Sequence, residues 1–210
     1  MDNRRAYDLW SQTYDDMPNP TRDLEGRALR TLLAGRVQGE VLELGCGTGK
    51  NTLWLQEQTG HVVAVDFSEA MLARAREKVR GARVEFRQLD IRRPLPFAEG
   101  RFGLVCFSLV LEHVENLQPV LNEAARVLRP GGLLYIGELH PFKQYLGSRA
   151  RFEHEGRTRA LQCFTHHLSD YFEAARGLQP AEVKEWFDEG RDGPPRLLTL
   201  LFRKPAPQEG

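Results

Sequence analysis

The chain has 210 residues, of which 41% are hydrophobic and 28% are charged, with Lys plus Arg and Asp plus Glu at 29 each. This composition excludes a disordered or fibrous chain, and the zero net charge gives no electrostatic reason to expect a nucleic acid or an anionic membrane as partner. Three scattered cysteines, Cys46, Cys106 and Cys163, exclude a disulfide framework, so a reduced cytoplasmic setting is expected. No apolar run approaches the roughly 20 residues of a membrane span.

The N-terminal region is predicted to be helical. Apolar side chains at helical spacing over 3–16 indicate an amphipathic helix, and Thr21 is predicted to cap a second helix. Both helices precede the first strand, so residues 1–36 are expected to form a lid or buttress on a main domain of residues 37–204. A tail at 205–210 is expected to be flexible.

Apolar strands alternate with helical segments through the middle of the chain. This rhythm predicts an α/β fold, a Rossmann-like, doubly wound seven-stranded sheet that is mostly parallel, with an antiparallel C-terminal hairpin strand. Residues 143–168 are too long for a plain connection and are expected to cover the substrate site. Strands are expected at 41–44, 61–66, 83–88, 102–108 and 133–138, and the hairpin at 181–187 and 195–203.

The first predicted strand, Val41–Leu44, runs into glycines at alternate positions, Gly45, Gly47 and Gly49, and a helical pattern follows at once. Glycine tolerates positive φ and lets a ligand approach with no Cβ in the way. A strand, a glycine turn and a helix N-terminus together predict a site for a nucleotide-like ligand. Lys50 occupies the place of the third glycine of the Gly-x-Gly-x-x-Gly dinucleotide pattern, which disfavours an NAD-type oxidoreductase.

The stretch Val41–Gly49 resembles the first motif of the class I S-adenosylmethionine-dependent methyltransferases. The resemblance covers about residues 41–140, and it implies an enzyme that transfers a methyl group in line from S-adenosylmethionine to a small-molecule acceptor and leaves S-adenosylhomocysteine. Four further elements follow in the family's order: Asp66 after the second strand, Asp90 after the third, Leu111–Val114 after the fourth and Arg126–Gly132 before the fifth.

The resemblance implies cofactor contacts at the strand ends. Asp66 is expected to accept hydrogen bonds from the ribose hydroxyls and Asp90 from the adenine amino group, although each acid could instead cap a helix or face solvent. Glu43 is expected beside the methionine ammonium, and Tyr14 over the methionine carboxylate. The expected contacts are Tyr14, Glu43, Gly45, Cys46, Gly47, Gly49, Asp66, Phe67, Asp90, Ile91, Ser108 and Leu109.

Methyl transfer from a sulfonium depends mainly on alignment and desolvation, and it needs a base only if the nucleophile arrives protonated. The sequence therefore need not carry an obvious catalytic residue, and His113, His140 and His167 are its candidates. Substrate contacts are expected beyond the strand ends, at Tyr7, Glu138, His140, Lys143, Tyr145, His166 and Tyr171.

Some acceptors and a metal site are disfavoured by the sequence, and other points stay open. Ser108–Leu111 stands where amino-methylating DNA enzymes resemble one another in an Asp/Asn-Pro-Pro-aromatic motif, so a DNA acceptor is disfavoured. No metal is expected, because His140, His154, His166 and His167 lack a metal-ligand spacing. The acceptor, the methylated atom, the choice between monomer and homodimer, and a non-catalytic S-adenosylmethionine-binding regulator as the alternative function remain open.

Overall fold

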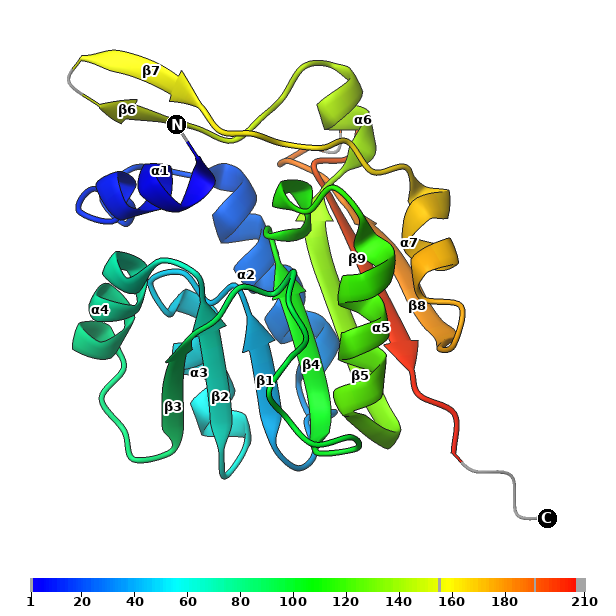
Figure 1. The fold of residues 1–210 in the computed structure, drawn as a ribbon. Coiled ribbons are helices and arrows are strands. Elements are labelled where there is room, and N and C mark those ends of the chain that lie inside the picture. The colour runs from blue at the N-terminus through cyan, green and yellow to red at the C-terminus, as the bar shows by residue number, and fades with distance from the viewer. Residues whose placement is uncertain (1, 155, 191, 207–210) are drawn as a thin grey trace.

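The computed structural model describes residues 2–154, 156–190 and 192–206 (Figure 1), so most of the tail predicted at 205–210 lies outside the described residues. A seven-stranded sheet has the order β3-β2-β1-β4-β5-β9-β8. Neighbours among the first five strands are parallel, whereas β9 runs antiparallel to both β5 and β8. The predicted fold class is confirmed. The strands are β1 (Val41–Leu44), β2 (Val62–Asp66), β3 (Val84–Gln88), β4 (Phe102–Ser108), β5 (Leu128–Leu139), β8 (Gln179–Trp186) and β9 (Leu197–Arg203).

Helices cover both faces of this sheet (Figure 1). Side chains alternate along a strand, so Leu42 and Leu44 of β1 join a core with α5 and α7, while Val41 joins the opposite core with α2 and α3. Strands buried on both faces read as continuous apolar runs. The helices are α2 (Pro20–Leu33), α3 (Lys50–Gln58), α4 (Glu69–Lys78), α5 (Leu117–Val127) and α7 (Leu168–Ala174).

A third layer lies above the carboxyl ends of the parallel strands (Figure 1). It contains α1 (Asn3–Trp10), α6 (Pro141–Tyr145) and a hairpin of β6 (Arg151–His154) and β7 (Arg157–Ala160). Ala6 and Trp10 of α1 form a small apolar cluster with Phe152 and Leu161, in which the Trp10 and Phe152 rings stack at 5.5 Å. The N-terminal helix of the segment predicted as a lid (1–36) therefore packs on the segment predicted as a cover (143–168).

Two helix boundaries differ from the predictions. The helix expected over 3–16 ends at Trp10, because the Ser11 hydroxyl donates to the Asp8 carbonyl and the chain continues as turns. The second helix is capped by Asn19, not Thr21: the Asn19 side chain accepts the Arg22 N–H at 3.0 Å, and Pro20 occupies the first turn. Among the described residues, no helix combines the length and apolar character needed to cross a bilayer.

Candidate functional site

A cavity of about 630 Å³ lies at the carboxyl ends of β1, β2 and β4, beneath α1. β1 lies between β2 and β4, so the cavity is at the point where strand order reverses, which is where open α/β sheets bind ligands. Of the cofactor contacts predicted from the sequence, all except Gly49 line this cavity. Of the predicted catalytic and substrate residues, His113 and Tyr7 alone do so.

The glycine turn shapes the cavity floor. Gly45 has φ +81°, and a Cβ there would lie 2.6 Å from Val110 Cγ2, so a side chain would both strain the backbone and collide with the wall. A Cβ at Gly47 would meet no heavy atom within 4 Å. Gly49 has a packing role, because its Cβ would approach the Ala75 methyl group of α4 at 3.1 Å. Neighbouring side chains therefore leave no room for a Cβ at Gly45 and little at Gly49, whereas the space beside Gly47 is open.

Asp66, the last residue of β2, organises the turn. Its carboxylate is 6% exposed and accepts the Gly47 N–H at 2.8 Å and the Ser68 N–H at 2.9 Å. Burial raises the pKa of Asp66 to about 6, against the lowering effect of these backbone hydrogen bonds. Since each carboxylate oxygen has two lone pairs, Asp66 can bind the turn and still accept hydrogen bonds from a ligand.

The other two predicted acids lie in unlike environments. The Arg92 guanidinium donates two hydrogen bonds to the Asp90 carboxylate, from Nε and from Nη2, both at 2.8 Å. These hydrogen bonds hold the pKa of Asp90 below its ordinary value. Glu43 is buried and accepts the Thr52 hydroxyl, and burial raises the pKa of Glu43 to about 8. Asp90 is therefore held as a carboxylate, while burial favours the neutral acid at Glu43.

A buried polar network that the sequence did not indicate joins α2 to the cavity wall. Glu25 on α2 is fully buried and accepts hydrogen bonds from Asn51 Nδ2 at 2.9 Å and Lys50 Nζ at 3.1 Å. The Tyr135 hydroxyl of β5 donates to its other oxygen at 3.2 Å, and Asn51 also reaches Ser108 Oγ at 3.2 Å. A glutamate on an amphipathic helix carries no pattern that marks it as buried, so only the tertiary structure reveals it.

Helix α1 closes the cavity opposite the sheet. The Tyr7 hydroxyl lies 2.7 Å from His113 Nε2, and the Tyr7 ring packs edge-on against Phe67 at 5.8 Å. Asn3 pairs with the backbone of Gln162 in both directions, donating to its carbonyl at 2.8 Å and accepting its N–H at 3.0 Å. The Arg4 guanidinium donates to the Phe67 carbonyl at 3.0 Å. Side chains of α1 thus contact three separate walls of the cavity.

Solved structures with this arrangement are known. The chain superposes on DhpI in complex with S-adenosylhomocysteine with a TM-score of 0.74 and 25% identity, covering 97% of this chain and 95% of DhpI. It superposes equally, at 0.74, on the N-methyltransferase NodS from Bradyrhizobium japonicum WM9 in complex with S-adenosyl-L-homocysteine, with 18% identity over 98% of this chain and 100% of NodS. At 18% identity the second likeness shows the fold alone.

Residues 42–136 match the family described as "Methyltransferase domain". This stretch runs from β1 into β5 and contains the glycine turn, Asp66 and Asp90. Residues 42–136 therefore carry a methyltransferase domain, and this match supports the class I S-adenosylmethionine-dependent family for that stretch. The sequence resemblance is confirmed.

Two named relatives match this chain over different lengths. A demethylmenaquinone methyltransferase from Clavibacter sepedonicus is 40% identical over 114 residues, which are 53% of this chain and 46% of the relative. A ubiquinone biosynthesis O-methyltransferase from Dechloromonas aromatica (strain RCB) is 28% identical over 173 residues, covering 81% of this chain and 70% of the relative. The chain thus spans less than half of the first relative's length.

The cavity fits S-adenosylmethionine, the cofactor of this methyltransferase family. The open space at Gly47 would admit a ligand against the backbone, and a buried acid with free lone pairs lies beside it at Asp66. The volume is within the range of about 300–1,000 Å³ that is typical of small-molecule sites.

The polar substrate pocket predicted from the sequence does not form, because most of its residues are engaged elsewhere. Glu138 is buried and accepts the Val110 and Leu111 N–H groups at 2.9 and 2.8 Å. His166 is buried, with Nε2 at 2.7 Å from the Val114 carbonyl, and Tyr171 lies in the core beside α5. These side chains hold the segments around the cavity together and do not line it.

The other predicted residues also lie outside the cavity. His140 caps α6 and bonds Glu185 at 3.0 Å, and Lys143 forms an ion pair with Asp188 at 3.8 Å. Tyr145 is 56% exposed, and its hydroxyl bonds His167 Nδ1 at 2.7 Å. Spacing along the chain could not show that the segment after β5 turns away from the cavity at α6.

Proposed function

We propose that the protein is a methyltransferase that transfers a methyl group from S-adenosylmethionine to a small-molecule acceptor and releases S-adenosylhomocysteine. The observation that carries this proposal is the cavity at the strand-order reversal, with the open Gly47 backbone and buried Asp66 on one side and the side chains of α1 on the other. The names of the matched relatives, which refer to menaquinone and ubiquinone biosynthesis, support a small-molecule acceptor.

The residues of the chain are suited to binding and alignment. The cofactor supplies an activated methyl group on a sulfonium with a neutral leaving group. Asp66 would hold the ribose hydroxyls, while Tyr7 and Tyr14 on the lid side exclude water from the cavity. Arg22 lies 5.2 Å over the Tyr14 ring and also lines the cavity, so it is a cation available to a ligand carboxylate on that side.

The acceptor would enter between α1 and the segment after β4. Polar groups of Asn3, Tyr7, His113 and Gln162 gather on this wall, and they are the groups available to orient an acceptor nucleophile. None of the other predicted substrate residues reaches it. The acceptor side of the site is therefore assigned to α1, the turn after β4 and the chain after β7.

Thermal shift with S-adenosylmethionine, S-adenosylhomocysteine and NAD tests cofactor choice. Stabilisation by both sulfur nucleosides and not by NAD is expected, and stabilisation by NAD alone would contradict the proposal. Incubation with a metabolite extract and a labelled methyl donor then tests turnover and identifies the acceptor. Cofactor binding without labelled product from any extract or quinone precursor would favour the alternative of a non-catalytic regulator. A cytoplasmic location stays a prediction.

A further inference from the structure

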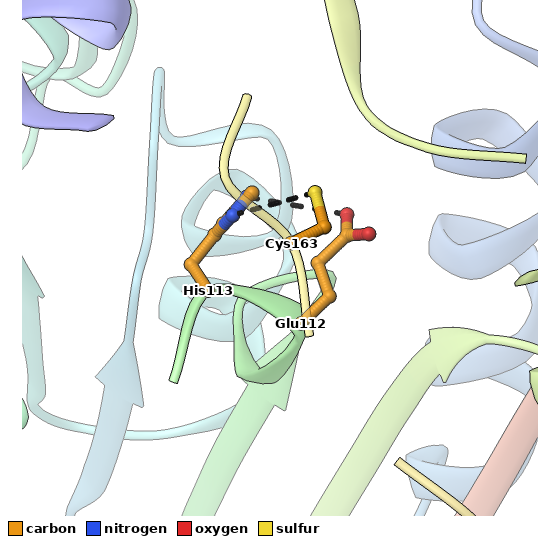
Figure 2. Close-up of side chains that lie close together, drawn as sticks. All are labelled: Glu112, His113 and Cys163. Carbon is orange, nitrogen blue, oxygen red and sulfur yellow. Dashed lines mark hydrogen bonds and ion pairs between the residues drawn. The ribbon is translucent and has the colours of Figure 1, made fainter. Parts of the chain in front are cut away.

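Three side chains of metal-ligand type meet beside the cavity (Figure 2), and one of them, that of His113, lines it. Glu112 and His113 belong to the short 3₁₀ helix η1 (Leu111–His113) after β4, and Cys163 lies on the chain between β7 and α7. One ligand atom from each residue lies within 4.8 Å of the others, and within residues 2–154, 156–190 and 192–206 this is the group that meets that criterion. The three side chains point toward one another (Figure 2).

The spacing of these atoms is close to that of a tetrahedral zinc site. Glu112 Oε1 lies 3.9 Å from His113 Nε2, whereas Cys163 Sγ lies 3.9 Å from the other ring nitrogen, Nδ1. Zinc-to-ligand bonds of about 2.0–2.3 Å place tetrahedral ligand atoms roughly 3.3–3.6 Å apart. Rotation of the Cys163 side chain toward Nε2 would be needed to bring the three ligand atoms around one ion bound at that nitrogen.

Glu112 supplies an independent sign of a missing partner. Its side chain is 8% exposed, and Oε2 is buried with no hydrogen-bond partner among the described residues. A bound cation would satisfy the unpaired oxygen.

The surroundings of His113 resemble those of a metal ligand. Nδ1 lies 3.0 Å from the Gln162 carbonyl, so an N–H at that position would be held by the backbone and would leave the Nε2 lone pair for a ligand. Nε2 now faces the Tyr7 hydroxyl at 2.7 Å. The ring is 9% exposed, yet His113 lines the cavity, which gives an ion a route of entry.

We propose that Glu112, His113 and Cys163 bind one divalent transition-metal ion of the zinc type, with its fourth coordination position open to the cavity. Thiolate and imidazole ligands select zinc over magnesium or calcium. Three protein ligands with one open position are typical of catalytic zinc sites. An ion at Nε2 displaces the Tyr7 hydroxyl from that nitrogen. The open position would hold water or an acceptor heteroatom; this last role rests on the proposed methyltransferase function, whereas the ion site itself does not.

Metal titration of the chelator-stripped full chain tests the site directly. Zn²⁺ binding at one ion per chain is measured by competition with a chromophoric chelator, and Co²⁺ is added in parallel to detect the near-ultraviolet charge-transfer band of a thiolate ligand. We expect Cys163→Ala to abolish that band, and Cys163→Ala and Glu112→Gln each to weaken Zn²⁺ binding by at least about 10-fold. Tyr7→Phe, which removes the competing hydroxyl, is expected to retain or increase the affinity.

Matched variants separate a lost ligand from a damaged fold. Cys106→Ala removes a thiol from the core of β4, and His61→Gln removes a histidine from the opposite end of the sheet; both are expected to bind zinc as the parent does. Circular dichroism and the unfolding midpoint show that each variant is folded, independently of any cofactor. Absence of one-to-one binding at micromolar zinc, or a Co²⁺ thiolate band that persists in Cys163→Ala, would overturn the proposal even if the methyltransferase activity is found.

Discussion

The Tyr7 hydroxyl oxygen lies 2.7 Å from Nε2 of His113, although 106 positions separate the two residues in the chain. This contact joins α1 to the turn after β4 across the mouth of the cavity. The rings also pack edge-on with centroids 5.5 Å apart. The same pair therefore links α1 to the turn after β4 and occupies the nitrogen that the proposed ion would take.

Removing this hydroxyl is expected to loosen the lid without unfolding the domain. Tyr7→Phe keeps the ring contacts and loses one hydrogen bond, worth about 0.5–1.5 kcal/mol. Amide hydrogen exchange of residues 3–10, measured by mass spectrometry in the metal-free chain, is expected to accelerate by about 2- to 10-fold. Tyr145→Phe, which removes an exposed hydroxyl contact to His167, serves as the control and should leave this segment unchanged. Equal exchange in Tyr7→Phe and the parent would show that the contact does not hold α1.

Asp66 is predicted to control cofactor affinity. Asp66→Asn replaces the charged carboxylate, which accepts hydrogen bonds, by a neutral amide. Hydrogen bonds to charged groups contribute about 1.5–3 kcal/mol to the binding free energy. The dissociation constant for S-adenosylhomocysteine, measured by calorimetry at pH 7.5, is expected to rise about 10- to 100-fold. Asp188→Asn, on the loop after β8, is expected to bind as the parent does. An Asp66→Asn variant with parental affinity would remove Asp66 from the ribose role.

The pKa of Asp66 also predicts how this affinity changes with pH. Because the pKa is about 6, the carboxylate becomes protonated as the pH falls from 7 to 5 and loses acceptor capacity. Parental affinity for S-adenosylhomocysteine is therefore expected to weaken over that range. Asp66→Asn should show a flatter profile in the same calorimetric series, and parallel profiles for the two proteins would contradict the assignment.

Glu43 is predicted to make folding stability depend on pH. Its native pKa is about 8 and its ordinary value is 4.5, so between these values the native chain holds a proton that the unfolded chain has released. The unfolding free energy from this group therefore falls as the pH rises from about 4.5 to about 8, by up to about 1.4 kcal/mol per pH unit. Glu43→Gln removes this loss. Urea unfolding at pH 5.5 and pH 8 should show the variant gaining on the parent at the higher pH, whereas a constant difference would refute it.

Gly45 is predicted to be the most constrained residue of the turn. Gly45→Ala combines a positive φ of +81° with a Cβ that would lie 2.6 Å from Val110 Cγ2, so a loss of about 1–3 kcal/mol of unfolding free energy is expected in urea titrations. Gly177→Ala, where a Cβ meets nothing within 4 Å, is the control and should remain within about 0.5 kcal/mol of the parent. Val110→Ala in the Gly45→Ala background should recover part of the loss, because it removes the colliding methyl groups.

Local patterns in the sequence determine the sheet, the glycine turn and the cofactor edge. Continuous apolar runs such as 62–65 must be buried on both faces, and burial on both faces requires a parallel sheet covered by helices. Once the strands are parallel, their carboxyl ends share one edge, so the residues that end them, such as Asp66 and Ser108, converge there from any separation in sequence. These inferences need only short-range periodicity and a general rule of topology.

The contacts on the side of the cavity formed by α1 and the chain after β7 follow only from the tertiary structure. Nothing local in the sequence places Tyr7 on His113 or Cys163 beside Glu112, since these contacts depend on how α1 and the chain after β7 pack across the strand ends. Most of the residues predicted to contact substrate lie outside the cavity for the same reason: Glu138 and His166 bind backbone groups from other segments, and Tyr145 is exposed after α6. Side-chain hydrogen bonds between distant segments follow from three-dimensional packing, which periodicity along the chain does not encode.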